Sequence, residues 1–206
     1  NEERKSRMPP KVKITREMIL NAALALTREQ GFEAVNARNI AAELECSTRP
    51  IFTAYQNMEE MKEDFLEFAY SFYCSYVEQY EKESGVEADL LWPLSYLSFA
   101  QDEPNLFQLL FVDDMALDLG KAMDFYQEIE NGEKADAFAQ RQGLERQKGR
   151  KVFLDLFLYT HGMAVLTATG KMHLQQKEQA AMVRTMLEAR LRWEKGEKME
   201  CRKGTI

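Results

Sequence analysis

Polar and basic residues on one short predicted helix are the side chains of this sequence best suited to reading a nucleic acid. Thr48, Arg49 and Thr53 belong to a predicted helix over residues 48–54, and Ser47 is placed to cap it. Arginine can donate hydrogen bonds to two acceptors of guanine at once, and threonine can contact a phosphate, a base edge or a thymine methyl group. The alternative is an ordinary solvated helix face. We favour contact with DNA because of the elements that the neighbouring residues predict.

Two further predicted helices flank this one. Asn36 is placed to cap a short helix whose apolar residues recur at helical spacing, namely Ala37, Ile40, Ala41 and Leu44. Asn57 opens a third helix, and Glu60 completes a capping-box-like pair with it. Pro50 falls at the third position of the middle helix, where its missing N–H leaves no hydrogen bond unmade. Two short helices joined by a tight turn predict a helix-turn-helix.

A longer run of residues matches a known pattern. It comprises Arg16, Ile19, Ala22, Ala23, Leu26, Gly31, Phe32, Ile40, Ala41, Ser47, Phe52, Tyr55 and Glu59. In these residues and their order, the segment resembles the DNA-binding domain of the TetR family of transcriptional regulators. The resemblance implies that DNA is contacted by Asn36, Arg38, Ser47, Thr48, Arg49, Pro50, Phe52, Thr53 and Tyr55. Phe52 and Met58 depart from the family, which usually has a tyrosine and a lysine there, both commonly touching phosphates.

Charge is divided unevenly along the chain. The 206 residues carry a net charge of −7, yet residues 1–57 carry nine Lys or Arg against seven Asp or Glu, a net +2. A basic N-terminal end followed by an acidic body indicates that only the N-terminal end approaches phosphates. Residues 1–14 are basic and contain Pro9 and Pro10, so we predict a flexible arm that either follows DNA or is a solvated tail.

The rest of the sequence predicts a larger helical domain. Apolar spacing and breaks at Gly or Pro predict helices over 15–30, 57–82, 88–101, 104–111, 150–170 and 175–195, loops over 112–117 and 140–149, and a weakly amphipathic stretch over 118–140 that Gly132 interrupts. No strand pattern is present. We therefore predict an all-α fold of about nine helices. Residues 15–57 form the helix-turn-helix domain, 58–196 a ligand-binding and dimerisation domain, and 197–206 a charged tail.

Aromatic residues are abundant in the predicted larger domain. Taken one at a time, each is better explained as ordinary helical core. As a set, within an architecture that resembles TetR regulators, they favour a pocket for a mostly apolar small-molecule effector. The residues expected to line it are Phe68, Phe72, Tyr76, Trp92, Tyr96, Phe99, Phe107, Phe111 and Phe157.

The last two predicted helices are apolar on more than one side. A helix that is apolar all round must be buried all round, so we predict that they pack against a second copy of the chain in a homodimer. The interface residues expected are Leu156, Met163, Leu166, Met182, Met186, Leu187 and Trp193. Residues 159–166 also resemble the dimerisation helix of TetR regulators. Asp155, on the same helix, is expected to meet an arginine, a cationic ligand or water.

The sequence lacks the residue patterns that are typical of enzymes and metal-binding proteins. The chain has two histidines, and its three cysteines, Cys46, Cys74 and Cys201, have no metal-ligand spacing. No Gly-rich nucleotide loop, nucleophile elbow or zinc-protease motif is present, so we expect no enzyme, no metal and no cofactor. His161 is interpreted as a hydrogen-bonded core residue. No apolar run is long enough to span a membrane and no signal sequence is visible, which favours the cytoplasm.

The function predicted from these features is regulation of transcription. The resemblance implies a ligand-responsive regulator, a homodimer that binds a palindromic operator in double-stranded DNA. In the family's usual mode it would be a repressor released by a small molecule. The alternative is a helix-turn-helix-derived protein that acts through protein–protein contacts without operator binding. The features that give this alternative some weight are Phe52, Met58 and the acidic total.

Overall fold

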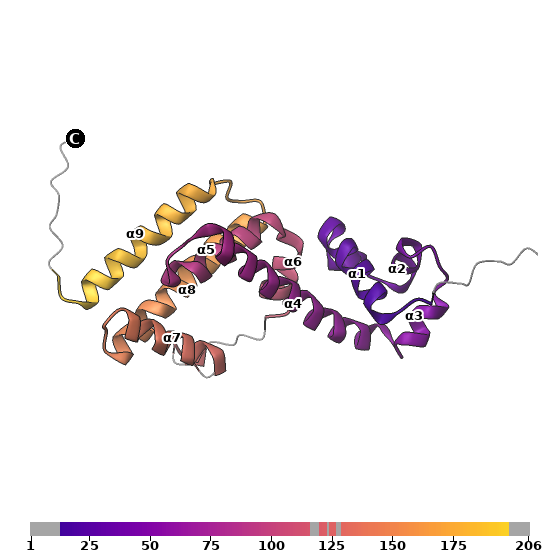
Figure 1. Ribbon diagram of the computed structural model, residues 1–206, viewed down its shortest axis with the longest axis horizontal. Helices are drawn as coiled ribbons and strands as arrows, with labels where there is room; N and C mark the ends of the chain where they lie inside the picture. Colours follow the sequence, from indigo (N-terminus) through magenta and orange to yellow (C-terminus); the bar gives the residue numbers. More distant parts are fainter. Residues whose placement is uncertain (1–12, 116–119, 123, 127–128, 198–206) are drawn as a thin grey trace, which may run out of the picture. The chain divides into compact units, whose positions relative to one another are not determined.

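Helices make up all the regular structure of the residues that the structure describes. The computed structural model describes residues 13–115, 120–122, 124–126 and 129–197, and within these ranges it contains nine α-helices and no strand (Figure 1). The prediction of an all-α fold with about nine helices is confirmed. The predicted arm up to residue 12 and the predicted tail from residue 198 lie outside the described residues. In the described ranges, no helix combines the length and the apolar character needed to cross a membrane.

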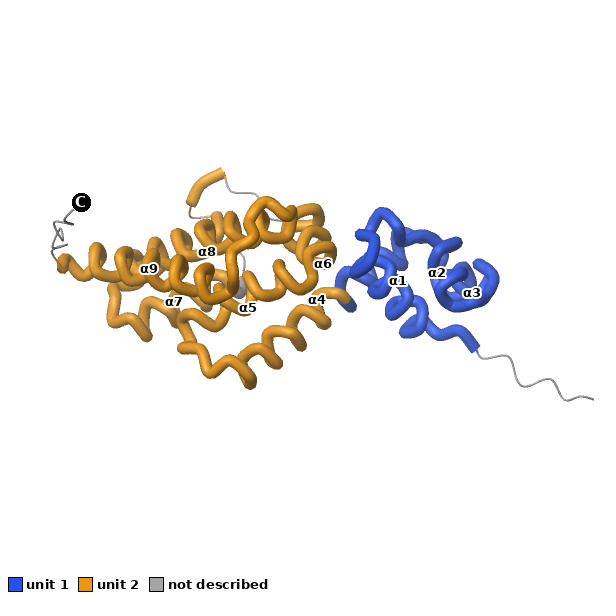
Figure 2. Tube along the Cα trace, turned by 90° about the horizontal axis from the view of Figure 1, so that it is seen from above, with its two compact units in different colours: residues 1–68 blue, residues 69–206 orange. Residues whose placement is uncertain are grey.

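The chain divides into two compact units (Figure 2). The first extends to Phe68 and the second begins at Ala69, so the division falls inside the long helix α4, Met58–Ser84. α4 therefore contributes its first part to the first unit and its remainder to the second. The domain boundary predicted from the sequence, between residues 57 and 58, lies at the start of the same helix.

The first unit contains α1 (Arg16–Gln30), α2 (Ala37–Glu43), α3 (Arg49–Ala54) and the start of α4. α1 is capped as predicted: the Thr15 side chain accepts a hydrogen bond from the amide of Met18, and the helix ends at Gly31, whose φ is 85°. Most of the predicted apolar positions are buried and form the core, namely Ile19, Ala22, Ala23, Leu26, Ile40, Ala41, Ile51, Met61 and Phe65. Burial of this core fixes α1, α2 and α3 against one another.

The helix caps near α3 differ in detail from the prediction. α3 begins at Arg49, the carbonyl of Thr48 accepts from the amides of Ile51 and Phe52, and Ser47 lies before the helix and does not cap it. Pro50 is consequently at the second helical position. Helix ends are set by backbone hydrogen bonds, which residue type alone specifies only to within one or two positions.

The predicted caps Asn36 and Asn57 are present, but Glu60 has a different partner from the one predicted. The side chain of Asn36 accepts from the amides of Arg38 and Asn39, and the side chain of Asn57 accepts from the amide of Glu60 at 2.9 Å. The Glu60 carboxylate does not complete the pair with Asn57. One of its oxygens accepts from the amide of Gln56 at 2.8 Å, and the other accepts from Arg16.

The second unit contains the remainder of α4, α5 (Ala88–Asp102), α6 (Pro104–Gln108), α7 (Ile129–Arg141), α8 (Arg146–Ala168) and α9 (Gln176–Glu194). α5 is central, since every residue from Pro93 to Ala100 is buried and the helix contacts α6, α8 and α9. Pro93 lies in its interior, not in its first turn. After α6 the chain forms a π-helical turn, Leu109–Asp113, where the sequence predicts the end of a helix and the start of a loop.

Two glycines were predicted to break helices and instead lie inside them. Gly132 is within α7, and Gly149 is within α8, so the predicted loop over 140–149 is reduced to 142–145. A Cβ atom on Gly149 would lie 2.1 Å from that of Ala139, and one on Gly132 would lie 3.0 Å from the Tyr126 carbonyl oxygen. Both positions therefore lack a side chain because another segment approaches closely, a requirement of tertiary packing that the local sequence does not reveal.

Candidate DNA-binding site

The surface of α3 presents three side chains from one side of a short helix. Arg49, Phe52 and Thr53 are spaced i, i+3 and i+4, and all three are exposed. The Thr53 hydroxyl donates to the Arg49 carbonyl at 2.9 Å, so it is engaged within the helix. Ile51 is fully buried and fixes the opposite side of α3 in the core. The arrangement places a guanidinium group and a phenyl ring together on the exposed face.

The start of α2 supplies the second group of predicted contacts. The Asn36 side chain is exposed and engaged as the cap of α2, with its oxygen 3.1 and 3.0 Å from the amides of Arg38 and Asn39. Arg38 is exposed in the first turn. A helix N-terminus attracts anions, and an exposed arginine beside it suits a phosphate.

The other predicted contact residues are placed less uniformly. Ser47 is exposed, whereas Thr48 and Pro50 are half-buried. Tyr55 is a correction: it is 2% exposed and belongs to the core, so it offers no surface to DNA. Burial raises the pKa of Tyr55 to about 12. Its ring lies under the guanidinium of Arg16, 4.3 Å from ring centroid to Cζ. Met58, where the family usually has a lysine, is half-buried at the first position of α4.

Arg16 holds the end of α3 in place, a role that the sequence did not reveal. Its Nε and Nη2 donate to the carbonyl of Ala54, the last residue of α3, at 3.1 and 2.7 Å. Nη1 lies 2.8 Å from a carboxylate oxygen of Asp64, and Nη2 lies 2.7 Å from one of Glu60. We call Arg16, Ala54, Glu60 and Asp64 the Arg16 clamp. It joins the start of α1 and the first turns of α4 to a helix-terminal carbonyl that lacks an intrahelical partner.

The residues predicted to bind an effector are mostly brought together. Tyr96, Phe99, Phe107 and Phe111 form one cluster with Tyr73, in which neighbouring ring centroids lie 4.9–6.4 Å apart. Trp92 joins it through Tyr96 at 5.4 Å and contacts Phe157 at 5.8 Å. Tyr76 joins through Phe99 at 5.2 Å. Phe72 is half-buried, and Phe68 belongs to the first unit.

Two polar contacts enter this aromatic cluster. Nδ1 of His161 lies 3.0 Å from the Tyr96 hydroxyl, and burial lowers the pKa of His161. The interpretation of His161 as a hydrogen-bonded core residue agrees with this position. The Tyr76 hydroxyl donates to Asp102 at 2.5 Å and contacts the Ser98 hydroxyl at 2.8 Å. Sequence reasoning did not name His161 as a member of the cluster, although it follows Phe157 by four residues, a helical spacing that the sequence shows.

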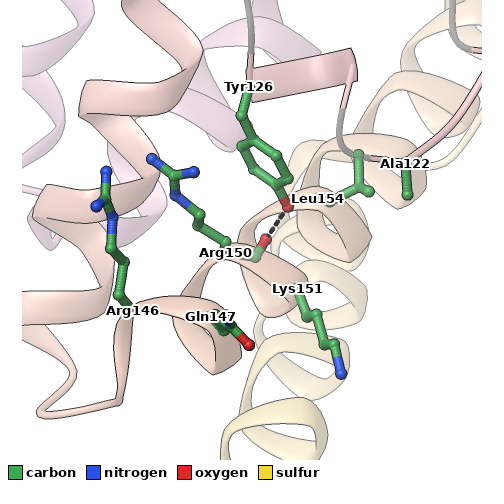
Figure 3. A pocket seen from close by; sticks show the side chains of 7 residues that line it. All are labelled: Ala122, Tyr126, Arg146, Gln147, Arg150, Lys151 and Leu154. Carbon is green, nitrogen blue, oxygen red and sulfur yellow. Dashed lines mark hydrogen bonds between the residues drawn. The ribbon is translucent and has the colours of Figure 1, made fainter.

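A separate hollow of about 400 Å³ lies at the start of α8. Its lining residues are Ala122, Tyr126, Arg146, Gln147, Arg150, Lys151 and Leu154 (Figure 3), and none of them is a predicted effector contact. The Tyr126 hydroxyl donates to the Arg150 carbonyl. Both arginines pair with Asp136, at 2.7 Å from Arg146 and 2.6 Å from Arg150, and the pairing holds the pKa of Asp136 well below its usual range. The arginines therefore have a structural partner within the unit.

The residues predicted for a dimer interface divide into two sets. Leu156, Met163 and Leu187 are buried within the protomer, so for them the prediction is wrong. Leu166, Met182 and Trp193 are 47%, 39% and 67% exposed, and Met186 is half-buried beside them. On α9 one apolar stripe packs on the protomer's own core through Val183 and Leu187, whereas on α8 residues of both apolar stripes are buried. Asp155 meets an arginine, since Arg190 Nε lies 2.7 Å from its carboxylate.

Among the described residues, no group of three or more His, Cys, Asp or Glu side chains is placed to hold a metal ion. The geometry of α2 and α3 is the geometry of a helix-turn-helix: Glu45, at a φ of 49°, lies in the tight turn between two short helices.

Comparison with known proteins agrees with this geometry. Residues 19–64 match the family model described as bacterial regulatory proteins, tetR family. No curated protein matches the chain. The matched segment covers α2 and α3 and includes most of α1 and the first turns of α4. Its last residue, Asp64, is the member of the Arg16 clamp that is farthest along the chain. Residues 19–64 therefore form a DNA-binding domain of the TetR family, the kind of domain that transcriptional regulators of TetR type carry.

Proposed function

We propose that this regulator binds a specific palindromic operator as a homodimer, reads it with α3, and loses operator affinity when an apolar small molecule binds its second unit. The observation that carries the proposal is the exposed face of α3. There Arg49 is solvent-exposed on a helix whose far side is fixed by Ile51 and whose end is held by the Arg16 clamp. A rigidly held guanidinium group is suited to the paired acceptors of guanine.

The dimer is supported by the apolar surface of α8 and α9. Leu158 and Leu166 on α8 are 50% and 47% exposed, and Met182 and Trp193 on α9 are 39% and 67% exposed. We call these four residues the α8–α9 surface. Large apolar side chains gathered on two adjacent helices favour burial against a second protein surface. A two-fold dimer of this kind places two reading helices on half-sites about 34–36 Å apart, so its operator is palindromic.

The response to an effector is supported by the aromatic cluster around Tyr96. The cluster combines apolar rings with a few polar groups, the composition of a small-molecule site, and His161 and Tyr96 supply hydrogen bonds within it. α4 contributes Tyr73 and Tyr76 to this cluster and Glu60 and Asp64 to the Arg16 clamp. We therefore expect an effector to act on DNA affinity through α4. A coupling of about 1–3 kcal/mol is typical, and linkage requires operator DNA to weaken effector binding by the same factor.

The test starts with selection of binding sites from random-sequence DNA duplexes by the full chain. We expect an enriched palindrome, which the wild-type protein shifts in a gel at lower concentration than a scrambled duplex of equal length. Recovery of random sequence would favour the alternative, a helix-turn-helix-derived protein that acts through protein contacts alone. Apolar compounds that raise the melting temperature of the protein are then tested for release of the selected duplex.

A further inference from the structure

Phe52 is exposed on the face of α3 that is proposed to meet DNA. Its side chain is 53% exposed, while Ile51 and Tyr55 on the same short segment are buried. Among the described residues of the first unit, it is the only large hydrophobic side chain that is exposed. A phenylalanine side chain that is half exposed to water forgoes part of the free energy of its burial, so an exposed phenyl ring at this position favours a partner that covers it.

The chemistry of a phenyl ring narrows the choice of partner group. The ring has no hydrogen-bond donor, so Phe52 is unsuited to a phosphate oxygen. In the major groove the apolar group on the base edges is the 5-methyl group of thymine, which phenylalanine contacts through dispersion and burial. Arg49 precedes Phe52 by three residues on the same face, and its guanidinium group suits guanine. The face therefore pairs a guanine reader with a methyl reader.

We infer that Phe52 is a specificity-determining residue that reads the methyl group of a thymine close to the guanine read by Arg49 in each half-site. This inference rests on the proposed operator binding and adds the identity of a second base. It assigns to Phe52 a base contact in place of a phosphate contact. An alternative occupant, a protein surface that covers the ring, is separated from it by the experiment below.

The experiment removes single methyl groups from the DNA without changing base pairing. In the duplex selected by the full-length wild-type chain, each thymine is replaced in turn by deoxyuridine, in one half-site and then in both. We expect wild-type affinity to fall about fourfold per contacted methyl group, and about 15-fold when both half-sites are changed. In Phe52→Ala the same replacement should change affinity less than about twofold, because the group that contacts the methyl is absent.

Two further variants keep the result specific to Phe52. Phe52→Leu retains an apolar side chain and should retain part of the sensitivity to deoxyuridine, which a loss of folding would not reproduce. Thr53→Ser removes the threonine methyl group, keeps the hydroxyl, and should leave the sensitive position unchanged. The guanine read by Arg49 is identified as the base at which Arg49→Ala relaxes specificity. The position of the sensitive thymine is then given relative to that guanine.

The outcomes separate this inference from the proposed function. If the wild-type chain selects an operator and no deoxyuridine replacement weakens binding, Phe52 does not read a methyl group and the inference is wrong. Equal sensitivity of the wild type and Phe52→Ala contradicts it as well, and that result assigns the methyl contact to another side chain. A wild-type chain that selects no sequence overturns the proposed function and this inference together.

Discussion

Two exposed surfaces of this protein carry large apolar side chains, and they differ in what surrounds those side chains. On α3 a single ring, Phe52, lies beside Arg49 and Thr53, whereas the α8–α9 surface carries four large apolar residues that are 39–67% exposed. A surface that mixes one ring with a cation suits the groove of DNA, which offers acceptors and methyl groups side by side. Several apolar side chains on paired helices suit another protein surface. The exposure of an apolar side chain therefore does not identify its partner by itself. The side chains that surround it do.

The largest effect is expected when charge is placed on the α8–α9 surface. In the variant Leu166→Asp with Met182→Asp, association should weaken about 1000-fold, since each substitution removes an interface contact of about 2 kcal/mol and places a charge in an apolar interface. Sedimentation of the wild type and the variant over a concentration series measures the effect. Both residues are exposed in the protomer, so folding should be retained.

A matched control sharpens this test. Ala181→Asp places the same charge at the adjacent exposed position of α9, about 100° around the helix from Met182. The control should associate like the wild type. A wild-type chain that sediments as a monomer at micromolar concentration, or equal weakening by the control, would contradict the assignment of this surface to a dimer.

The second effect concerns the support of α3. Arg16→Gln removes the charged hydrogen bonds to Ala54, Glu60 and Asp64, and we expect operator affinity to fall about tenfold while affinity for scrambled DNA falls less. Arg16→Lys keeps the charge without the planar geometry and should lie in between. Arg28→Gln on the same helix is the control. Equal losses for operator and scrambled DNA would mean that the clamp contributes charge and does not position α3.

A smaller and more uniform effect is expected at the start of α2. Arg38→Ala removes one exposed positive charge, so it should weaken operator and scrambled duplex alike by a few-fold. The slope of log affinity against log salt concentration should become shallower by about one unit. Fluorescence anisotropy over a salt series measures this slope. A loss confined to the operator would show that Arg38 reads a base.

The smallest effect expected is a change in acid stability, and it is predicted for one charged cluster in each unit. The pKa of Glu60 is lowered because the amide of Gln56 and the guanidinium of Arg16 donate to it, and the pKa of Asp136 is lowered by Arg150 and Arg146. A carboxylate whose folded pKa is lowered stabilises the fold above its unfolded pKa and loses that contribution as the pH falls. Melting temperature should therefore fall as the pH drops below the ordinary values of 4.5 and 3.8. The acid-induced fall should be smaller in Glu60→Gln and in Asp136→Asn, since neither variant has that carboxylate to protonate.

Local patterns predicted the first unit better than the second. Ile19, Ala22, Ile40 and their neighbours recur at helical spacing, and their burial needed no knowledge of distant residues. Tyr55 was expected to contact DNA because of the family resemblance, and its residue type did not correct that expectation, since a hydroxyl-bearing ring suits the surface and the core alike. The Arg16 clamp was missed because it joins residues 38–48 positions apart in the sequence. Such contacts are set by tertiary packing and leave no periodic signal.

In the second unit, the sequence showed apolar residues on more than one side of α8 and α9 without showing which of them face the protomer core. Val183 and Leu187 face the protomer core, while Met182 and Trp193 are exposed, and residue type distinguishes the pairs poorly. Gly149 was interpreted as a helix breaker, yet it lies inside α8 where Ala139 of α7 approaches closely. The place where two helices meet decides which apolar residues are buried and which glycine must lack a side chain. That place is a property of the folded chain and not of the local sequence.

The central claim is that α3 reads DNA through Arg49, and it is tested most directly by base specificity. The affinity of the full chain is measured for the selected operator and for operators changed at each base pair, with wild type, Arg49→Ala and the charge control Arg28→Ala. We predict that Arg49→Ala loses about 1–3 kcal/mol on the operator and stops discriminating at one guanine position in each half-site, while Arg28→Ala keeps full discrimination. If Arg49→Ala binds the operator as tightly and as selectively as the wild type, α3 is not the helix that reads DNA.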